Sequence, residues 1–128
     1  MEKIPRCDET QMNAIIREVS NSLGYGRREK VYQNALCYSL NLNGLDASVE
    51  VPHPVYYKGY CVGTTFIDIM CATCLIEVKY VKTLNDIHRA QVSAYARDCE
   101  QDAVLVNFGA KPVEIEYIKF SDLPVTNN

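Results

Sequence analysis

Apolar side chains recur at helical spacing in three parts of the chain. In the first part the repeat predicts an amphipathic helix over about residues 9–23. The apolar residues that carry this repeat are Met12, Ile15, Ile16, Val19 and Leu23. Two further helices are predicted over about residues 28–42 and about residues 84–98, each bounded by turn-forming or capping residues.

Shorter runs with alternating or continuous apolar residues predict strands between and after these helices. The predicted segments are 48–51, a hairpin of 55–57 and 60–62 around Lys58-Gly59, then 65–70, 75–81, 103–108 and 113–120. The run 103–108 is almost entirely apolar, as expected for a strand buried on both faces, and 113–120 is expected to pair beside it.

The order of elements, α-α-β-β-β-β-α-β-β, predicts an α/β or α+β domain with helices packed on a central mixed sheet. A chain of 128 residues fits one domain with a sizeable core. We expect residues 1–128 to form that domain, with its core at about 9–120 and a polar C-terminal tail, 121–128, that frays.

Two of the predicted strands carry charge where a buried strand should carry none. These residues are Asp68 in one strand and Glu77 and Lys79 in the next. Residues i and i+2 of a strand share a face, so Glu77 and Lys79 should project side by side, with Val78 facing the other way. Burying such charges is costly unless they are paired or bound, which indicates a site. The alternative is a surface salt bridge between Glu77 and Lys79.

The turn between these strands relates the two carboxylates. If Ala72-Thr73 is its centre, opposite residues have numbers that sum to 145, and Asp68 lies across from Glu77. Their Cβ atoms would then be roughly 4.5–5.5 Å apart, and the like charges would repel unless a cation lay between them. A hard divalent ion such as Mg²⁺ suits carboxylate ligands. Ala-Thr is a poor two-residue turn, but a four-residue loop keeps the same pairing, whereas an asymmetric loop would break it.

A third carboxylate, Glu29, begins the apolar face of the second helix, ahead of Tyr32 and two leucines at helical spacing. One interpretation is an acid in the first turn that favours the helix dipole. The other is a carboxylate that leans over the sheet toward Asp68 and Glu77. For Tyr32, a core aromatic whose hydroxyl finds a partner is preferred over a residue that orients the carboxylate.

The third predicted helix has polar residues at or beside its inner face. That face is expected to consist of Leu84, Ile87, Gln91, Ala94 and Tyr95. Gln91 interrupts it, and His88 lies on its flank. These two residues are either a satisfied core glutamine and a surface histidine, or side chains that contact phosphate or support a metal site, since the helix follows Lys79.

Net charge and cysteine content exclude few classes of protein. The net charge of −3 does not by itself indicate nucleic-acid binding, although several basic residues lie near the carboxylates in sequence. No run approaches the ~20 apolar residues of a membrane span. The chain start lacks a secretory signal, and six cysteines then point to a reducing, intracellular compartment, cytoplasmic or nuclear. Cys71 and Cys74 form a lone CxxC motif, for which small apolar fillers are preferred over a redox pair.

Several motifs in order resemble one known family. The segment 26–32 has a glycine, then Glu29 and Tyr32 at the spacing of the GxxExxY proteins, a branch of the PD-(D/E)XK nuclease-like superfamily. The resemblance continues through 55–59, Ile67-Asp68, 76–79, His88 to Gln91 with Tyr95, and 105–109, and it covers roughly residues 11–120. One departure is Tyr25, where the family usually has proline.

The resemblance implies a restriction-endonuclease-like α-β-β-β-α-β core with a metal site at its centre. In such a site Asp68 and Glu77 would hold Mg²⁺ or Mn²⁺, assisted by the backbone carbonyl of Val78, and Glu29 would complete the metal shell. Lys79 would orient or deprotonate the attacking water. Gln91 matches the polar residue of the helix after this strand.

We therefore expect a Mg²⁺-dependent nuclease that hydrolyses phosphodiester bonds of DNA, or of RNA as the less favoured polymer. The alternative is a catalytically silent nuclease fold that binds nucleic acid or a protein partner. A homodimer is compatible with the small size of the chain.

Overall fold

The computed structural model describes residues 6–124 and contains three α-helices and one five-stranded sheet. The elements are α1 (Glu9–Leu23), α2 (Glu29–Leu42), β1 (Ser48–Tyr57), β2 (Tyr60–Met70), β3 (Cys74–Lys79), α3 (Asp86–Cys99), β4 (Asp102–Asn107), β5 (Glu114–Ile118) and a short 3₁₀ turn at Phe120–Asp122. The α+β class with a central mixed sheet is therefore confirmed. Two helices, a run of strands, a third helix and two strands follow one another as predicted, but the run has three strands where four were expected.

The strands lie in the order β1-β2-β3-β4-β5, so that the chain builds the sheet from one edge to the other. Only β3 and β4 are parallel, and α3 makes the crossover that a parallel pair needs. All other neighbours are antiparallel. β3 and β4 therefore lie in the interior of the sheet, where the dielectric constant around a charged side chain is low.

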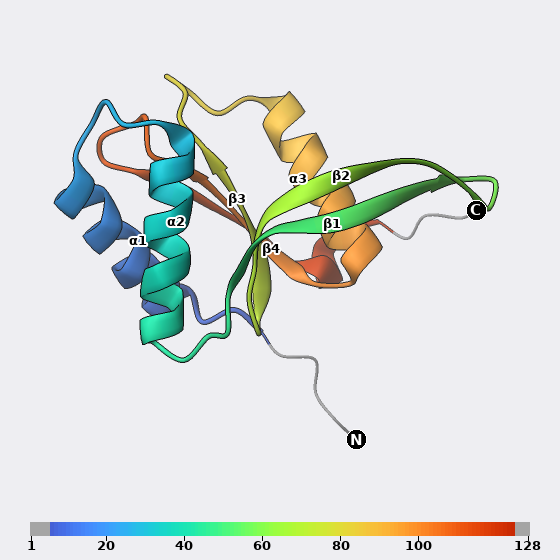
Figure 1. The fold of residues 1–128 in the computed structure, drawn as a ribbon, viewed down its shortest axis with the longest axis horizontal. Coiled ribbons are helices and arrows are strands. Elements are labelled where there is room, and N and C mark those ends of the chain that lie inside the picture. Colours follow the sequence, from blue (N-terminus) through green and yellow to red (C-terminus); the bar gives the residue numbers. More distant parts are fainter. Residues whose placement is uncertain (1–5, 125–128) are drawn as a thin grey trace.

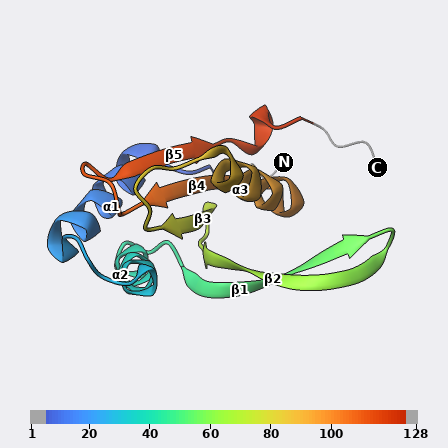
Figure 2. The same cartoon turned by 90° about the horizontal axis from the view of Figure 1, so that it is seen from above.

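Helices cover both faces of this centre (Figures 1 and 2). The face covered by α1 and α2 includes Ile69, Ile76, Val78, Val104 and Val106. The opposite face, covered by α3, includes Ile67, Leu75, Ala103 and Leu105. Because alternate residues of β4 are buried against different helices, the prediction that 103–108 is buried on both faces is confirmed.

The first two strands are longer than predicted. Pro52 and Pro54 were expected to separate two short segments, but both lie inside the continuous strand β1, opposite Phe66 and Thr64 of β2. Proline has no N–H to donate, which an edge strand tolerates because that position can face solvent. β1 is the edge strand, so the prolines shape one side of it without ending it.

The third helix differs from the prediction in its start and in its buried face. It begins at Asp86, after an Asn85 cap, and the buried residues of α3 are Val92, Tyr95 and Ala96. Ile87 is 78 % exposed and Gln91 is also exposed, so the expected inner face is wrong by part of a turn. Packing against β4 and β5, and not the apolar stripe alone, sets the rotation of this helix.

Residues 121–123 of the predicted tail belong to or follow the 3₁₀ turn, and the expectation that residues 125–128 fray lies outside the described residues. Within the described part of the chain, no helix is long and apolar enough to cross a membrane.

Candidate functional site

The β2–β3 hairpin has the register that the sequence predicted. Ile69 pairs with Ile76 and Met70 with Leu75, so that opposite residues sum to 145. The four-residue turn is closed by the N–H of Cys71, which donates to the carbonyl of Cys74 at 2.9 Å. Asp68 and Glu77 occupy the next position of the same register.

At that position the backbone hydrogen bonds between β2 and β3 end. The two carboxylates accept hydrogen bonds from backbone N–H groups instead. The N–H of Asp68 donates to Glu77 Oε1 at 3.1 Å, and the N–H of Val78 donates to Asp68 Oδ2 at 2.8 Å. Each carboxylate thus holds the opposite strand where β2 leaves β3 (Figure 2). These two backbone hydrogen bonds use Glu77 Oε1 and Asp68 Oδ2, so the other oxygen of each carboxylate is left for other partners.

The backbone on the other side of β2 is irregular at the same level. Ile67 pairs with Val51 and Ile69 with Val49, which places Glu50 level with Asp68. Glu50 has φ 51°, a left-handed conformation that is rare for a residue other than glycine. Its carboxylate pairs with Lys30 of α2 at 2.9 Å. Strained backbone of this kind is often found at functional sites, where the surrounding structure holds it in place.

The surroundings of Glu77 disfavour the ionised form of its carboxyl group. Its side chain is 3 % exposed, and burial, followed by the nearby charge of Asp68, raises its pKa to about 8. The positive charge of Lys79 acts in the opposite direction and lowers the pKa of Glu77, as expected for neighbours on one face of β3. At neutral pH the Asp68–Glu77 pair therefore retains a proton in the absence of another cation.

The alternative of a surface salt bridge between Glu77 and Lys79 does not hold. Glu77 is buried, and the ion pairs among residues 6–124 include none between these two side chains. Lys79 is half-buried at the end of β3, beside Asn107 of β4.

Glu29 reaches the same end of β3 from the first turn of α2. Its Oε2 accepts a hydrogen bond from the N–H of Tyr80 at 3.1 Å, one residue beyond Lys79. Among the residues that the structure describes, however, no three His, Cys, Asp or Glu side chains are grouped so that they could hold a metal ion. Glu29 thus lies close to the strand end without joining Asp68 and Glu77 in one cluster.

Gly26 and Tyr32, from the 26–32 segment, both contact Tyr80 directly after the end of β3. The N–H of Gly26 donates to the hydroxyl of Tyr80 at 2.7 Å. Tyr32 is fully buried, stacks on Tyr80 and Phe108, and donates its hydroxyl to the carbonyl of Gly24 at 2.6 Å. The Tyr32 hydroxyl therefore binds the loop before α2, in line with the preferred interpretation of a core aromatic whose hydroxyl finds a partner.

Sequence reasoning missed the residues that hold the chain after β3. Asn107 is fully buried, and its Oδ1 accepts from the N–H groups of Val81 and Gly109, both at 2.9 Å. A Cβ on Gly109 would overlap the backbone of Val81. The available signal was a polar residue and a glycine directly after an apolar strand, but only the fold shows that both face the segment following Lys79.

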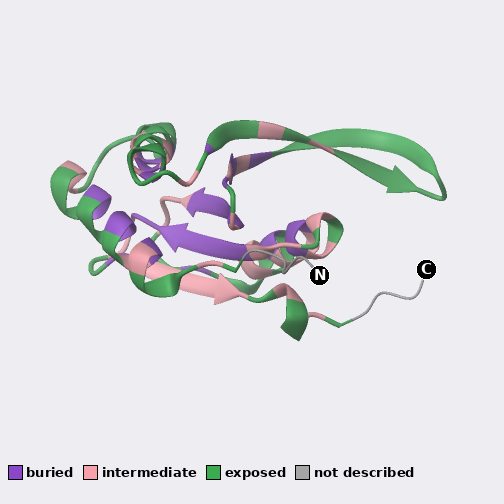
Figure 3. Ribbon diagram, turned by 90° about the horizontal axis from the view of Figure 1, so that it is seen from below, coloured by how far each residue is buried: buried purple, intermediate pink, exposed green. Residues whose placement is uncertain are grey.

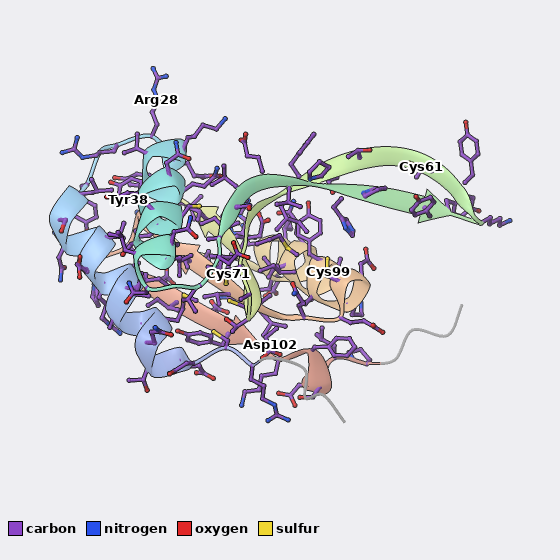
Figure 4. All side chains as sticks on the ribbon, turned by 60° about the horizontal axis from the view of Figure 1, so that its bottom comes forward. Arg28, Tyr38, Cys61, Cys71, Cys99 and Asp102 are labelled. Carbon is purple, nitrogen blue, oxygen red and sulfur yellow. The ribbon has the colours of Figure 1, made fainter. Side chains whose placement is uncertain are left out.

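The two polar residues of α3 form no hydrogen bond with Asp68 or Glu77 among the residues that the structure describes. His88 Nδ1 accepts from the N–H of Asn85 at 3.2 Å and so caps the helix, while Gln91 is exposed on its surface. Arg89, one of the basic residues near the site in sequence, is engaged by both carboxylate oxygens of Glu116 at 2.8 and 2.9 Å. At least one of the basic residues near the carboxylates in sequence is therefore neutralised by an ion pair, whereas Arg28 projects from the start of α2 (Figure 4).

The paired carboxylates suit a hard divalent cation in charge and in donor type, because each has an oxygen that the two backbone hydrogen bonds do not use. Such a cation would remove the repulsion that raises the pKa of Glu77. Asp68 and Glu77 would hold it, and water or substrate oxygens would supply the remaining ligands.

Comparison with known proteins gave one family-level result. A family model described as the PD-(D/E)XK nuclease superfamily matches residues 8–120. No curated protein and no solved structure matches the chain.

Proposed function

Because the chain belongs to the PD-(D/E)XK nuclease superfamily, we propose that it is a metal-dependent nuclease that hydrolyses phosphodiester bonds of DNA, with RNA as the less favoured polymer. The observation that carries this proposal is the pair of carboxylates, Asp68 and Glu77, facing each other where two central strands separate. Glu77 is buried, and its pKa is raised to about 8. Neutral side chains could accept the same two backbone hydrogen bonds, so a structural role alone does not explain two facing acids.

In this proposal Asp68, Glu77 and the carbonyl of Val78 bind Mg²⁺ or Mn²⁺. The bound ion would supply a more acidic water and neutralise phosphoryl oxygens. Lys79 lies on the face of Glu77, where its ammonium would orient that water and stabilise charge on the phosphate. Glu29, now bound to the N–H of Tyr80, would contribute through water or after a small shift of its side chain.

The remaining assignments complete the proposal. Gln91 and His88 would contact substrate from α3, and Tyr32 would support the loop that carries Glu29. Membership of the GxxExxY branch, a single nuclease-like domain over residues 1–128, and an intracellular location are also proposed. The six free cysteines support a reducing compartment.

The test combines metal binding with cleavage. Mn²⁺ is titrated calorimetrically into the wild type, Asp68→Asn and the exposed control Glu18→Gln, and the same proteins are incubated with labelled single- and double-stranded DNA. We expect the wild type and the control to bind metal and cleave, and Asp68→Asn to do neither. Full metal-dependent cleavage by Asp68→Asn would reject the assignment of the site.

A second candidate is a nuclease fold that binds nucleic acid or protein without turnover. It is favoured by one observation, the absence of a third grouped ligand among residues 6–124. Saturable binding of DNA that is unchanged by EDTA and yields no product would support this candidate over the first.

A further inference from the structure

β1 and β2 form a long two-stranded ribbon that projects beyond the helices, and we refer to residues 51–67 as the arm (Figures 1 and 2). β2 is paired with β3 only at Ile69 and Met70. From Tyr60 to Ile67, the edge of β2 that faces away from β1 has no strand partner within the described part of the chain. Unpaired strand edges readily accept another strand.

Most of the arm is exposed (Figure 3), and it carries several large apolar side chains. Its exposed large apolar residues are Val55, Tyr56, Tyr57, Tyr60, Val62 and Phe66. Scattered exposed apolar residues are ordinary on a protein surface, but a contiguous group marks an interaction surface.

The two edges of the arm are not equivalent. Pro52 and Pro54 cannot donate to β2, so their pairs with Phe66 and Thr64 are positions where N–H groups point away from the partner strand. The outer edge of β1 therefore lacks two donors. By the same alternation the N–H groups of Thr64 and Phe66 point outward from β2, as does that of Asp68, which reaches Glu77. Only the β2 edge can accept another strand along its length.

The charge of the arm indicates which partner fits. Residues 51–67 contain no Asp or Glu, one lysine, Lys58, and one histidine, His53, in a chain of net charge −3. One positive charge gives little attraction for a polyanion. A neutral strand, in contrast, can approach its own copy without repulsion, and antiparallel pairing of identical strands is compatible with two-fold symmetry.

The base of the arm is held against α3, so the arm would not have to become ordered before it pairs with another strand. His53 Nε2 lies 2.9 Å from Asp98 Oδ2, and the His53 ring packs edge-on against Tyr95, both on α3. These contacts cover the α3 side of the arm near its base and leave the β2 edge open.

We propose that the β2 edge of the arm pairs antiparallel with the β2 edge of a second copy of this chain. Pairing through this edge buries side chains of β2 and not those of β1. The two aromatic residues of β2, Tyr60 and Phe66, are 74 % and 57 % exposed and would supply roughly 260 Å² per copy if each ring offers about 200 Å². The total of about 500 Å² is smaller than a stable specific interface needs, so the dimer should be weak and should form only as the protein concentration rises.

Sedimentation velocity from about 1 to about 200 µM protein tests this proposal. We expect the wild type to shift from 14.5 kDa to twice that mass as concentration rises. Thr64→Pro removes an outward N–H without removing a bond to β1, and it should remain monomeric. The matched control Thr64→Val keeps the N–H and should dimerise as the wild type does.

Phe66→Lys provides a second test that does not depend on a proline. It places a charge on each copy of the edge, and we expect at least a tenfold higher dissociation constant with an unchanged circular dichroism spectrum. A wild type that stays at 14.5 kDa throughout, or a folded Thr64→Pro that dimerises like Thr64→Val, would overturn the proposal. Binding of a single-stranded oligonucleotide by a strictly monomeric wild type would instead assign the arm to nucleic acid.

Discussion

Replacing Glu77 with glutamine should make the protein more stable at high pH and leave its stability at low pH nearly unchanged. Glutamine resembles the protonated acid in shape. Its oxygen can accept from the N–H of Asp68, as Glu77 Oε1 does, and its NH₂ can donate to the Asp68 carboxylate. The substitution therefore removes the buried charge while keeping the hydrogen bonds of the site.

The magnitude follows from the pKa of the buried acid. Burial and Asp68 raise that pKa from the ordinary 4.5 to about 8. The folded state thus binds the proton more tightly than the unfolded chain does, and stability falls as pH rises from 4.5 through 8. At about 1.4 kcal/mol for each pH unit, the loss above pH 8 is about 5 kcal/mol. That is comparable with the whole stability of a small domain.

Urea unfolding in EDTA between pH 5 and pH 9 measures the effect. We expect Glu77→Gln to match the wild type within about 1 kcal/mol at pH 5 and to exceed it by up to about 5 kcal/mol at pH 9. Glu18→Gln, an exposed change of the same type, should follow the wild type throughout. Millimolar Mg²⁺ should restore wild-type stability at pH 9 but not alter Glu77→Gln. Parallel pH profiles for the wild type and Glu77→Gln would refute the reasoning.

Three further changes test the frame around the site. Gly109→Ala should lower stability by about 1–3 kcal/mol through overlap with backbone, whereas Gly63→Ala, which meets nothing within 4 Å, should change the melting temperature little. Tyr32→Phe loses the hydroxyl that donates to the Gly24 carbonyl and accepts, at 3.4 Å, from the N–H of Arg27, but it keeps its stacking. Urea unfolding should therefore show a loss of about 1–2 kcal/mol; an unchanged midpoint would contradict this. The thiol of Cys74, 3.5 Å from Cys71 Sγ, lowers the pKa of Cys71 to about 6; alkylation of Cys71, followed by mass spectrometry, should therefore rise through that pH and move toward pH 9 in Cys74→Ala.

The sequence predicted best where neighbouring residues determine the structure. The bounds of α1 follow from its apolar repeat, and they match the prediction at 9–23. The symmetry of the turn predicted the register of β2 on β3, because an antiparallel hairpin is defined by its own loop. The position of Asp68 across from Glu77 follows from that register.

Prediction was poorer where distant packing decides. Whether Pro52 and Pro54 interrupt a strand depends on its place at the edge of the sheet, which local sequence does not reveal. The rotation of α3 depends on its contacts with β4 and β5, so Gln91 appeared internal in the repeat and is exposed in the fold. The contact of Glu29 with Tyr80 joins residues 51 positions apart, and the sequence indicated only its general direction.

The hydrogen bonds that converge on Tyr80 link two parts of the protein into one cooperative unit. The loop before α2 binds its hydroxyl through Gly26, and α2 binds its N–H through Glu29. Opening this loop would therefore break a hydrogen bond to Tyr80, directly after the end of β3. We expect the loop before α2 and the end of β3 to become mobile together. In hydrogen exchange, the amides of Gly26 and Tyr80 should exchange at a common rate, and any ligand that fixes one should protect the other.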